Sequence, residues 1–413
     1  MEKQKCRGMR DLLPHDMLRF RHIEDVFRSC CLKRGYQEVR TPTLEYLHLF
    51  TATGTLTPSM LSRVYSFLDW DGWSGERVVL RPDGTIPVAR LYINNPSEAE
   101  VARLFYVTNI FAFEETGKEN RERWQCGAEF LGGAEATGDT EIIMLAEEVV
   151  RKLGLDKVEL QLSHAGLVKA LIKELKLSPG EEAKLISRVL GGDWQALTET
   201  RSGGFELDRF LSLLLNLKGK SSGFLQNMKA LSLRASRELR SALEDFINIA
   251  ALLDGLGCDY EIDIAATRNF EYYTGVCFQL LADGERIGGG GRYNDLIPLM
   301  SGKNLPACGF ALYVDPIMKL LPLESKESGK SGVLVKSGEL SPEVAKKCFD
   351  LAQALRSAGH VAELDFAGRE PCGHRWVVSV SGKRRSAFAI VDQKQKERRD
   401  VASVEEVLSV LRG

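Results

Sequence analysis

The sequence lacks a strong net charge and lacks any long apolar run. Its 413 residues carry a formal net charge of -2, so no bulk positive field is available to hold a nucleic-acid backbone. No apolar stretch reaches the length that a membrane-spanning helix needs, and no apolar segment follows Met1–Lys5 as it would in a secretory signal. We therefore expect a cytoplasmic protein with no membrane partner.

Paired cysteines and metal-ligand spacings are also missing. The nine cysteines are an odd number, and no two of them form a Cys-x-x-Cys motif. This usage is typical of reduced and mostly buried thiols. Cys30 and Cys31 are adjacent on a predicted helix, which places at least one of them in the core, a redox role being the alternative. The sequence indicates neither a metal site nor a bound cofactor.

The composition is that of a globular protein with more than one domain. Hydrophobic residues make up 44% of the chain and charged residues 27%. A chain of 413 residues is too long for one compact core. We predict a core over residues 1–322 that includes a helical segment at about 167–257, where leucines recur three and four residues apart. A linker over 323–332 then leads to a small α/β domain over 333–413.

A predicted hairpin ends in four consecutive glycines. Thr274–Leu281 is β-branched, aromatic and apolar, and Ala282–Gly284 supplies a turn before the glycines at 288–291. Such a bare backbone suits either the close approach of a ligand or a flexible turn. Tyr272 and Tyr273 alternate across the strand, so one hydroxyl can face a pocket above the glycines. This favours a ligand site.

The segment from Arg268 to Leu296 resembles a hairpin of the histidyl-tRNA synthetase family. It reads Arg-x-x-x-Tyr-Tyr-Thr-Gly and then Gly-Gly-Gly-Arg-Tyr-Asn-Asp-Leu, like that family's histidine-recognition hairpin and entry to motif 3. Gly8–Pro14 and Gly35–Pro42 resemble the family's opening and its motif 1. The resemblance implies an α+β fold with a class II synthetase-like antiparallel sheet flanked by helices. It also implies a homodimer through motif 1 and a C-terminal α/β domain like a shortened anticodon-binding domain.

The same resemblance implies a histidine-binding pocket. Asp83 lies in a Pro-Asp-Gly turn where the family has Arg-Pro-Glu-x-Thr, and an ordinary turn is the alternative. Gln125 and Glu129 match two residues that read histidine, and as buried polar groups they need partners. Arg268 matches an arginine of histidine activation, or it pairs with a carboxylate. The candidate set is Asp83, Thr85, Gln125, Glu129, Arg268, Tyr272, Tyr273, Gly289 and Gly290.

Two positions depart from the pattern of the aminoacylating family members. Class II enzymes use one arginine at the end of a motif 2 strand for the α-phosphate of ATP, and another in motif 3 for adenine and the γ-phosphate. Here Ala112 and Pro316 take these places, and neither can donate to a phosphate. We therefore expect no aminoacyl adenylation. The chain then resembles the non-aminoacylating members, which assemble with a short ATP phosphoribosyltransferase catalytic subunit and let histidine inhibit the first step of histidine biosynthesis.

Two other functions stay open. An active but divergent histidyl-tRNA synthetase would need Arg268 together with Arg121 or Arg123 to replace the missing arginines. A free-standing histidine sensor would use the same pocket with another partner. The residues leave open the stoichiometry, the role of the C-terminal domain, and whether histidine binds in this pocket or at a subunit interface. Basic clusters at 383–385 and 394–399 are typical of solvated surface, so tRNA is not an expected partner.

Overall fold

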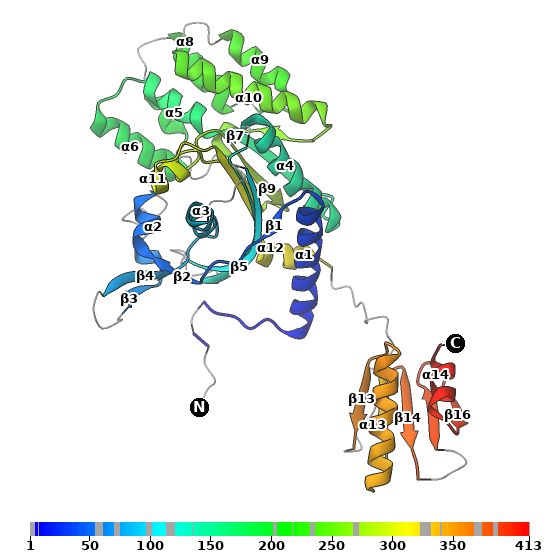
Figure 1. Ribbon diagram of the computed structural model, residues 1–413. Coiled ribbons are helices and arrows are strands. Elements are labelled where there is room, and N and C mark those ends of the chain that lie inside the picture. The colour runs from blue at the N-terminus through cyan, green and yellow to red at the C-terminus, as the bar shows by residue number, and fades with distance from the viewer. Residues whose placement is uncertain are drawn as a thin grey trace. The chain divides into compact units, whose positions relative to one another are not determined.

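Figure 1 shows the computed structural model of the chain. It describes residues 5–6, 8–53, 61–69, 75–95, 101–112, 120–133, 135–200, 205–216, 218–231, 236–266, 272–322, 332–338, 341–366, 374–382 and 387–412. Arg268 and the basic cluster at 383–385 lie outside these residues, as does 323–331 of the predicted linker. The chain divides into two compact units, Met1–Leu321 and Pro322–Gly413, which are described separately.

The first unit is built around an eight-stranded sheet. Its order is β1 (Gln37–Glu38), β5 (Ala102–Phe111), β6 (Glu122–Leu131), β11 (Ala307–Tyr313), β10 (Glu285–Arg292), β9 (Val276–Ala282), β7 (Val158–His164) and β8 (Glu261–Ile262). All neighbours are antiparallel except the outermost pairs, β1 with β5 and β7 with β8. The expected antiparallel class II sheet is confirmed.

Helices cover one face of this sheet along most of its width (Figure 1). These are α1 (Pro14–Lys33), α4 (Glu135–Lys152) and α12 (Val314–Leu320). Helix α1 begins with Pro14 at its first turn, and the Asp16 carboxylate accepts a hydrogen bond from the Leu13 N–H at 3.1 Å. Its Phe20, Ile23 and Phe27 share one buried face. The main hydrophobic core therefore lies between these helices and the sheet.

A smaller layer lies against the opposite face, at the β5–β6 side. It contains α2 (Leu47–Ala52), α3 (Thr85–Asn94) and α11 (Leu296–Ser301), with a second hydrophobic cluster beneath them. An antiparallel sheet of β2 (Leu44–Tyr46), β4 (Glu76–Leu80) and β3 (Ser66–Asp69), in the order β2-β4-β3, borders this layer. Short 3-10 turns occur at Leu61–Arg63 and Ile264–Ala266. This layer leaves part of the sheet face open for a site.

The described residues between β7 and β8 form six helices. They are α5 (Ala165–Glu174), α6 (Pro179–Leu190), α7 (Gln195–Glu199), α8 (Phe205–Asn216), α9 (Ser222–Leu231) and α10 (Arg237–Gly255). Ser236 caps α10 by accepting the Leu239 N–H at 3.2 Å. In Figure 1 these helices gather at the β7 side of the sheet, and α10 packs on α4 and α5. No helix in the described part of the chain is long and apolar enough to cross a membrane.

The second unit is a five-stranded sheet with two helices. The elements are β12 (Val333–Lys336), α13 (Pro342–Ser357), β13 (Ala362–Asp365), β14 (Trp376–Val380), β15 (Phe388–Asp392), β16 (Glu397–Val401) and α14 (Val404–Arg412), with strand order β13-β12-β14-β15-β16. Sequence alone suggested a basic loop where β16 forms. Its Glu-Arg-Arg-Asp run has little strand propensity, but it pairs with β15 as an edge strand, where charged side chains are favoured.

Candidate functional site

Strand register brings the polar and glycine residues of the centre of the large sheet onto one face. On β6 and β11, Gln125, Gly127 and Glu129 stand opposite Tyr313, Ala311 and Gly309. The same row continues through Gly289 and Gly291 of β10, Gln279 and Cys277 of β9, and Gln161 and Ser163 of β7. The other face carries core residues such as Phe130, Phe310 and Phe278. Because side chains alternate along a strand, the two faces differ completely in chemistry.

Glu129 is the buried acid at the centre of this face. It is 1% exposed, and it accepts hydrogen bonds from the hydroxyls of Tyr106, at 3.2 Å, and Tyr293. Burial raises the pKa of Glu129 to about 8. The hydroxyls of Tyr293 and Thr85 act in the opposite direction, because their hydrogen bonds favour the ionised form. A Cβ added to Gly309 would lie 1.8 Å from the Glu129 Oε2, so only glycine leaves room for the carboxylate.

The raised pKa of Glu129 predicts a specific pH dependence of stability. Since the folded pKa of about 8 exceeds the ordinary 4.5, stability present at low pH is lost as pH rises toward 8. Between about pH 6 and pH 8 we expect the wild-type free energy of unfolding to fall by about 1–3 kcal/mol relative to Glu129→Gln. Urea unfolding at a series of pH values measures this. Parallel curves for the two proteins would contradict it.

Asp83 and Thr85 lie beside Glu129 at the start of α3. The Asp83 Oδ1 accepts the Ile86 N–H at 3.0 Å, so one oxygen holds its own turn. Burial nevertheless raises the pKa of Asp83, because these backbone donors do not offset desolvation. The charge of the neighbouring Asp83 acts in the same direction as burial on Glu129 and also raises its pKa. Two desolvated carboxyls side by side favour a cationic ligand.

The two predicted tyrosines lie on the hairpin side of this group of residues. The Tyr272 ring stacks on Tyr293, with centroids 5.3 Å apart at 27°, and meets Tyr273 edge to face at 5.2 Å. Within the described part of the chain, the Tyr272 hydroxyl and the Gln125 Oε1 are buried without a hydrogen-bond partner. Buried polar atoms without partners are rare in proteins. A ligand with both a donor and an acceptor would satisfy them.

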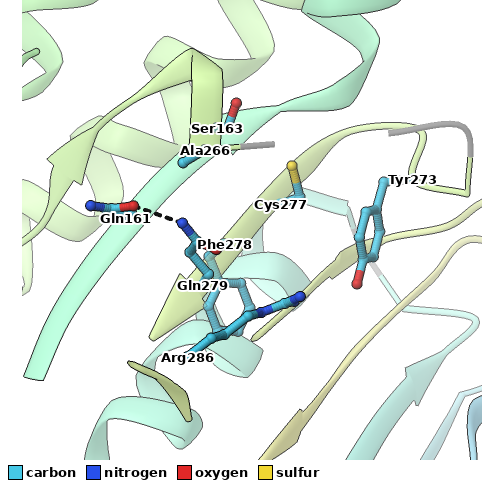
Figure 2. A pocket seen from close by; sticks show the side chains of 8 residues that line it. All are labelled: Gln161, Ser163, Ala266, Tyr273, Cys277, Phe278, Gln279 and Arg286. Atoms are coloured by element: carbon cyan, nitrogen blue, oxygen red, sulfur yellow. Dashed lines mark hydrogen bonds between the residues drawn. The ribbon is translucent and has the colours of Figure 1, made fainter. Parts of the chain in front are cut away.

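A second group of residues continues this face toward β7. A pocket there is lined by Gln161, Ser163, Ala266, Tyr273, Cys277, Phe278, Gln279 and Arg286 (Figure 2). The Gln279 Nε2 donates to the Gln161 Oε1 at 2.7 Å. Tyr273 thus belongs both to this pocket and to the aromatic group around Tyr272. No cluster of three or more metal-binding side chains occurs among the described residues.

Of the candidate residues, Tyr273 lines this pocket, and not all of the others lie on the polar sheet face. Gly290 pairs with Phe310 and Phe278 on the helix-covered face, and a Cβ there would meet the Gly309 carbonyl oxygen at 2.1 Å. Strand packing therefore requires a glycine at position 290, whereas Gly289 lies on the polar face. Arg268 lies outside the described residues. The structure brings together Asp83, Thr85, Gln125, Glu129, Tyr272, Tyr273 and Gly289 on or beside one sheet face.

Ala112 and Pro316, the two positions at which the sequence led us to expect lost arginines, lie just after strands β5 and β11. Ala112 follows β5 and donates its N–H to the Arg121 carbonyl at 3.0 Å. Pro316 lies in the first turn of α12, beside Asp315, which accepts the Trp124 N–H at 3.1 Å. Tyr313, at the end of β11, has the Arg286 guanidinium 5.6 Å from its ring centre.

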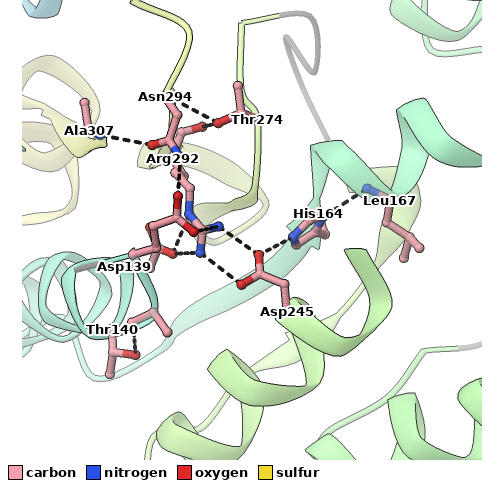
Figure 3. A network of polar contacts seen from close by, with 11 residues as sticks. Asp139, Thr140, His164, Leu167, Asp245, Thr274, Arg292, Asn294 and Ala307 are labelled. Carbon is pink, nitrogen blue, oxygen red and sulfur yellow. Dashed lines mark hydrogen bonds and ion pairs between the residues drawn. The ribbon is translucent and has the colours of Figure 1, made fainter. Parts of the chain in front are cut away.

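Sequence reasoning did not single out three residues that hold the pocket in place. Tyr106 and Tyr293 bind the Glu129 carboxylate. Arg292 donates to Asp139 of α4 at 2.9 Å and to Asp245 of α10 at 2.9 Å (Figure 3). Tyr293 and Arg292 belong to the recognised Gly-Arg-Tyr motif, which was their only signal. Nothing in the sequence alone pairs Tyr106 with Glu129.

The Arg292 network ties four distant segments together. Asp245 also accepts from the His164 Nε2 at 3.0 Å, while the His164 Nδ1 accepts the Leu167 N–H at 3.0 Å. The ring is therefore neutral with its proton on Nε2, and burial lowers its pKa. The Arg292 carbonyl accepts the Thr274 N–H at 2.8 Å, next to the two tyrosines. The pocket hairpin is thereby linked to α4 and to the helical segment.

This fold, with its row of polar and glycine residues on one face of the sheet, has known relatives. The model of the family described as Histidyl-tRNA synthetase matches residues 8–317. ATP phosphoribosyltransferase regulatory subunits from three strains of Dehalococcoides mccartyi are 46% identical over 410 residues, covering 99% of this chain and 98% of each relative. The histidine–tRNA ligase of Methanocaldococcus jannaschii is 31% identical over 376 residues, 89% of this chain and 87% of that protein.

Solved structures agree with the fold. A structure described as an ATP phosphoribosyltransferase regulatory subunit/histidyl-tRNA synthetase from Bacillus halodurans superposes with a TM-score of 0.77 at 24% identity, covering 90% of this chain and 95% of the other. The apo histidyl-tRNA synthetase of S. aureus gives a TM-score of 0.67 at 19% identity, covering 99% of both chains. The chain belongs to the histidyl-tRNA synthetase family and, within it, to the group of ATP phosphoribosyltransferase regulatory subunits.

Proposed function

We propose that this chain is a non-catalytic subunit that activates a short ATP phosphoribosyltransferase catalytic subunit and makes it sensitive to histidine. The names of its 46% identical relatives support the first part. The buried acids Glu129 and Asp83, which suit a cationic ligand, support the second. The protein acts in the cytoplasm as a homodimer of this chain within a larger hetero-oligomer, and it needs neither tRNA nor a cofactor.

The observation that carries this proposal is the pair of desolvated acids on the sheet face, together with two positions that cannot bind a phosphate. Glu129 and Asp83 lie buried among aromatic hydroxyls. Ala112 and Pro316, where the resemblance leads us to expect arginines, have no side-chain donor. Losing even one electrostatic donor to a transition state costs about 3–4 kcal/mol, so adenylation without both arginines is disfavoured. A pocket that binds without reacting suits a sensor.

Control by histidine requires a difference in affinity between two states of the complex. A ligand that binds both states equally shifts nothing. By linkage, the effect is reciprocal. If histidine changes the affinity of this chain for the catalytic subunit by some factor, the catalytic subunit must change the histidine affinity of this chain by the same factor. The Arg292 network is a physical route, because it joins the pocket hairpin to the helical segment.

The decisive experiment measures turnover of ATP and phosphoribosyl pyrophosphate by the short catalytic subunit from the same organism. The assay is run with and without this protein, and with histidine titrated in. Activity that arises on mixing and falls with histidine supports the proposal. No effect on mixing would discard this partner.

A second candidate function is a divergent histidyl-tRNA synthetase. The 31% identity to a histidine–tRNA ligase and the presence of Arg268 favour it. Of its two possible substitutes for the lost arginines, Arg121 donates to the Tyr65 hydroxyl at 3.4 Å. Histidine-dependent exchange of pyrophosphate into ATP by the purified chain would establish this function, and its absence under saturating histidine would discard it.

The Tyr272→Phe variant should weaken ligand binding without lowering the stability of the free protein. The Tyr272 hydroxyl is buried without a hydrogen-bond partner in the described chain, so it carries a desolvation cost that no bond offsets. Removing the hydroxyl should leave the free protein as stable as before, or more stable by about 1 kcal/mol. Histidine, if it pairs with this hydroxyl, should bind about 10-fold more weakly. Thermal unfolding and calorimetric titration measure the two effects. Unchanged histidine affinity would remove the Tyr272 hydroxyl from the site.

A further inference from the structure

Arg286 is a cation on the polar sheet face without a carboxylate partner among the described residues. Its Nε donates to the Gly288 carbonyl at 3.4 Å, and its guanidinium lies 5.6 Å from the Tyr313 ring centre. Both terminal nitrogens are left with no acceptor in the described chain. Figure 2 shows the side chain extending across the pocket toward Tyr273. A guanidinium in such a place has strong donors directed at an incoming anion.

A β-bulge places Arg286 on this face. Arg286 pairs with Leu281, but Gly288 pairs with Leu280, so Ile287 is an extra residue in β10. In a regular strand without a bulge, Arg286 and Gly289 would lie on opposite faces, because they are three residues apart. With it, Ile287 points into the main core, where it is 0% exposed, and Arg286 lies over Gly289. A Cβ on Gly289 would be 2.8 Å from the Arg286 Nη2.

The polar sheet face therefore carries an acid at one place and a cation at another. The Glu129 carboxyl lies over Gly309 and the Arg286 guanidinium over Gly289. Gly309 pairs with Gly291, so the two groups are separated by one strand and two residues, which corresponds to about 8 Å. Only glycine and alanine line the floor between them, at Gly291 and Ala311. This separation suits a free amino acid whose protonatable side chain lies at one end and whose carboxylate lies at the other.

We propose that Arg286 is the α-carboxylate anchor of the histidine site. The inference rests on the proposed histidine sensing and adds the residue that distinguishes the amino acid from its decarboxylated analogue. Glu129 and Asp83 bind the imidazole and ammonium groups of histidine. Arg286 binds its carboxylate through a fork of two parallel charge-assisted hydrogen bonds. Tyr273 lines the same pocket as Arg286. Burial raises the pKa of Tyr273, so its hydroxyl stays protonated, although the Arg286 charge acts to lower that pKa.

The test compares L-histidine with histamine, which lacks the carboxylate, by calorimetric titration of the full chain. We expect the wild type to bind histamine about 10- to 100-fold more weakly than histidine, which is the effect of losing hydrogen bonds to a charged group. Arg286→Gln should weaken histidine binding by the same factor and leave histamine binding unchanged. Arg286→Lys, which keeps the charge without the fork, should restore part of the histidine affinity.

Lys319→Gln is the matched control. Lys319 is an exposed cation that pairs with Glu285, the residue before Arg286, so the variant removes the same charge at the same end of the hairpin. It should keep wild-type affinity for both ligands. Equal wild-type affinity for histidine and histamine, or loss of both ligands in Arg286→Gln, would overturn the assignment of Arg286 while histidine sensing stands. A wild type that binds neither ligand would overturn histidine sensing itself, and this inference with it.

Discussion

Inhibition by histidine is expected to disappear in Glu129→Gln, while activation of the catalytic partner persists. The desolvated Glu129 carboxyl gains an ionised state when a cation enters the pocket, and the neutral amide cannot supply that charge. Loss of one buried charge-assisted contact corresponds to a rise on the order of 100-fold in the histidine concentration needed for half inhibition. The change is isosteric, and glutamine can still bond to the Tyr106 and Tyr293 hydroxyls.

The assay is turnover of the reconstituted complex with histidine titrated in, for the wild type, Glu129→Gln and a control. Glu159→Gln is the matched control, because it makes the same chemical change on β7 of the same sheet, at an exposed position. It should be inhibited like the wild type. If Glu129→Gln were also inhibited normally, Glu129 would not belong to the histidine site.

Arg292→Met should destabilise the first unit by about 3–5 kcal/mol, the usual cost of removing one partner from a buried ion pair. The Arg292 side chain is 7% exposed and that of Asp139 is 1% exposed. Burial already raises the pKa of Asp139 to about 6, with the Arg292 charge opposing the rise. Without Arg292, Asp139 must either stay as an uncompensated buried charge or bind a proton, and both outcomes cost stability.

Urea unfolding followed by circular dichroism measures this loss. The control is Arg188→Met in α6, where the side chain is 49% exposed and pairs with Asp193 and Glu199 at the surface. That change should cost no more than about 1 kcal/mol. The double variant Arg292→Met with Asp139→Asn should recover part of the loss, because it removes the stranded charge. A cost below that of the control would show that the network contributes little.

Local sequence pattern was enough to find the hairpin and several residues that the structure brings together. Glu129 and Gln125 stood out because a buried acid and amide among apolar strand residues need partners. The direction in which a residue faces was harder to predict. Gly289 and Gly290 read alike in the sequence, yet they lie on opposite faces because register is fixed by pairing with β9 and β11.

The other differences also arise from long-range structure. The bulge at Ile287 carries no turn signature, so the exposure of Arg286 to the pocket could not be read from the sequence. Tyr106 meets Glu129 only because β5 and β6 pair in one register, with Leu104 opposite Glu129. The strand at Glu397–Val401 exists because β15 offers an open edge. Propensity describes a segment alone, whereas each of these features depends on its neighbour.

The glycine at 309 has a consequence for how such a site can change during evolution. Any larger residue there would expel the Glu129 carboxylate, so the floor and the acid can only be kept or lost together. Tyr313, which is not fully buried, is not coupled in this way to a floor glycine. A lineage can therefore exchange residues elsewhere on the sheet while the acid and its glycine are inherited as a pair.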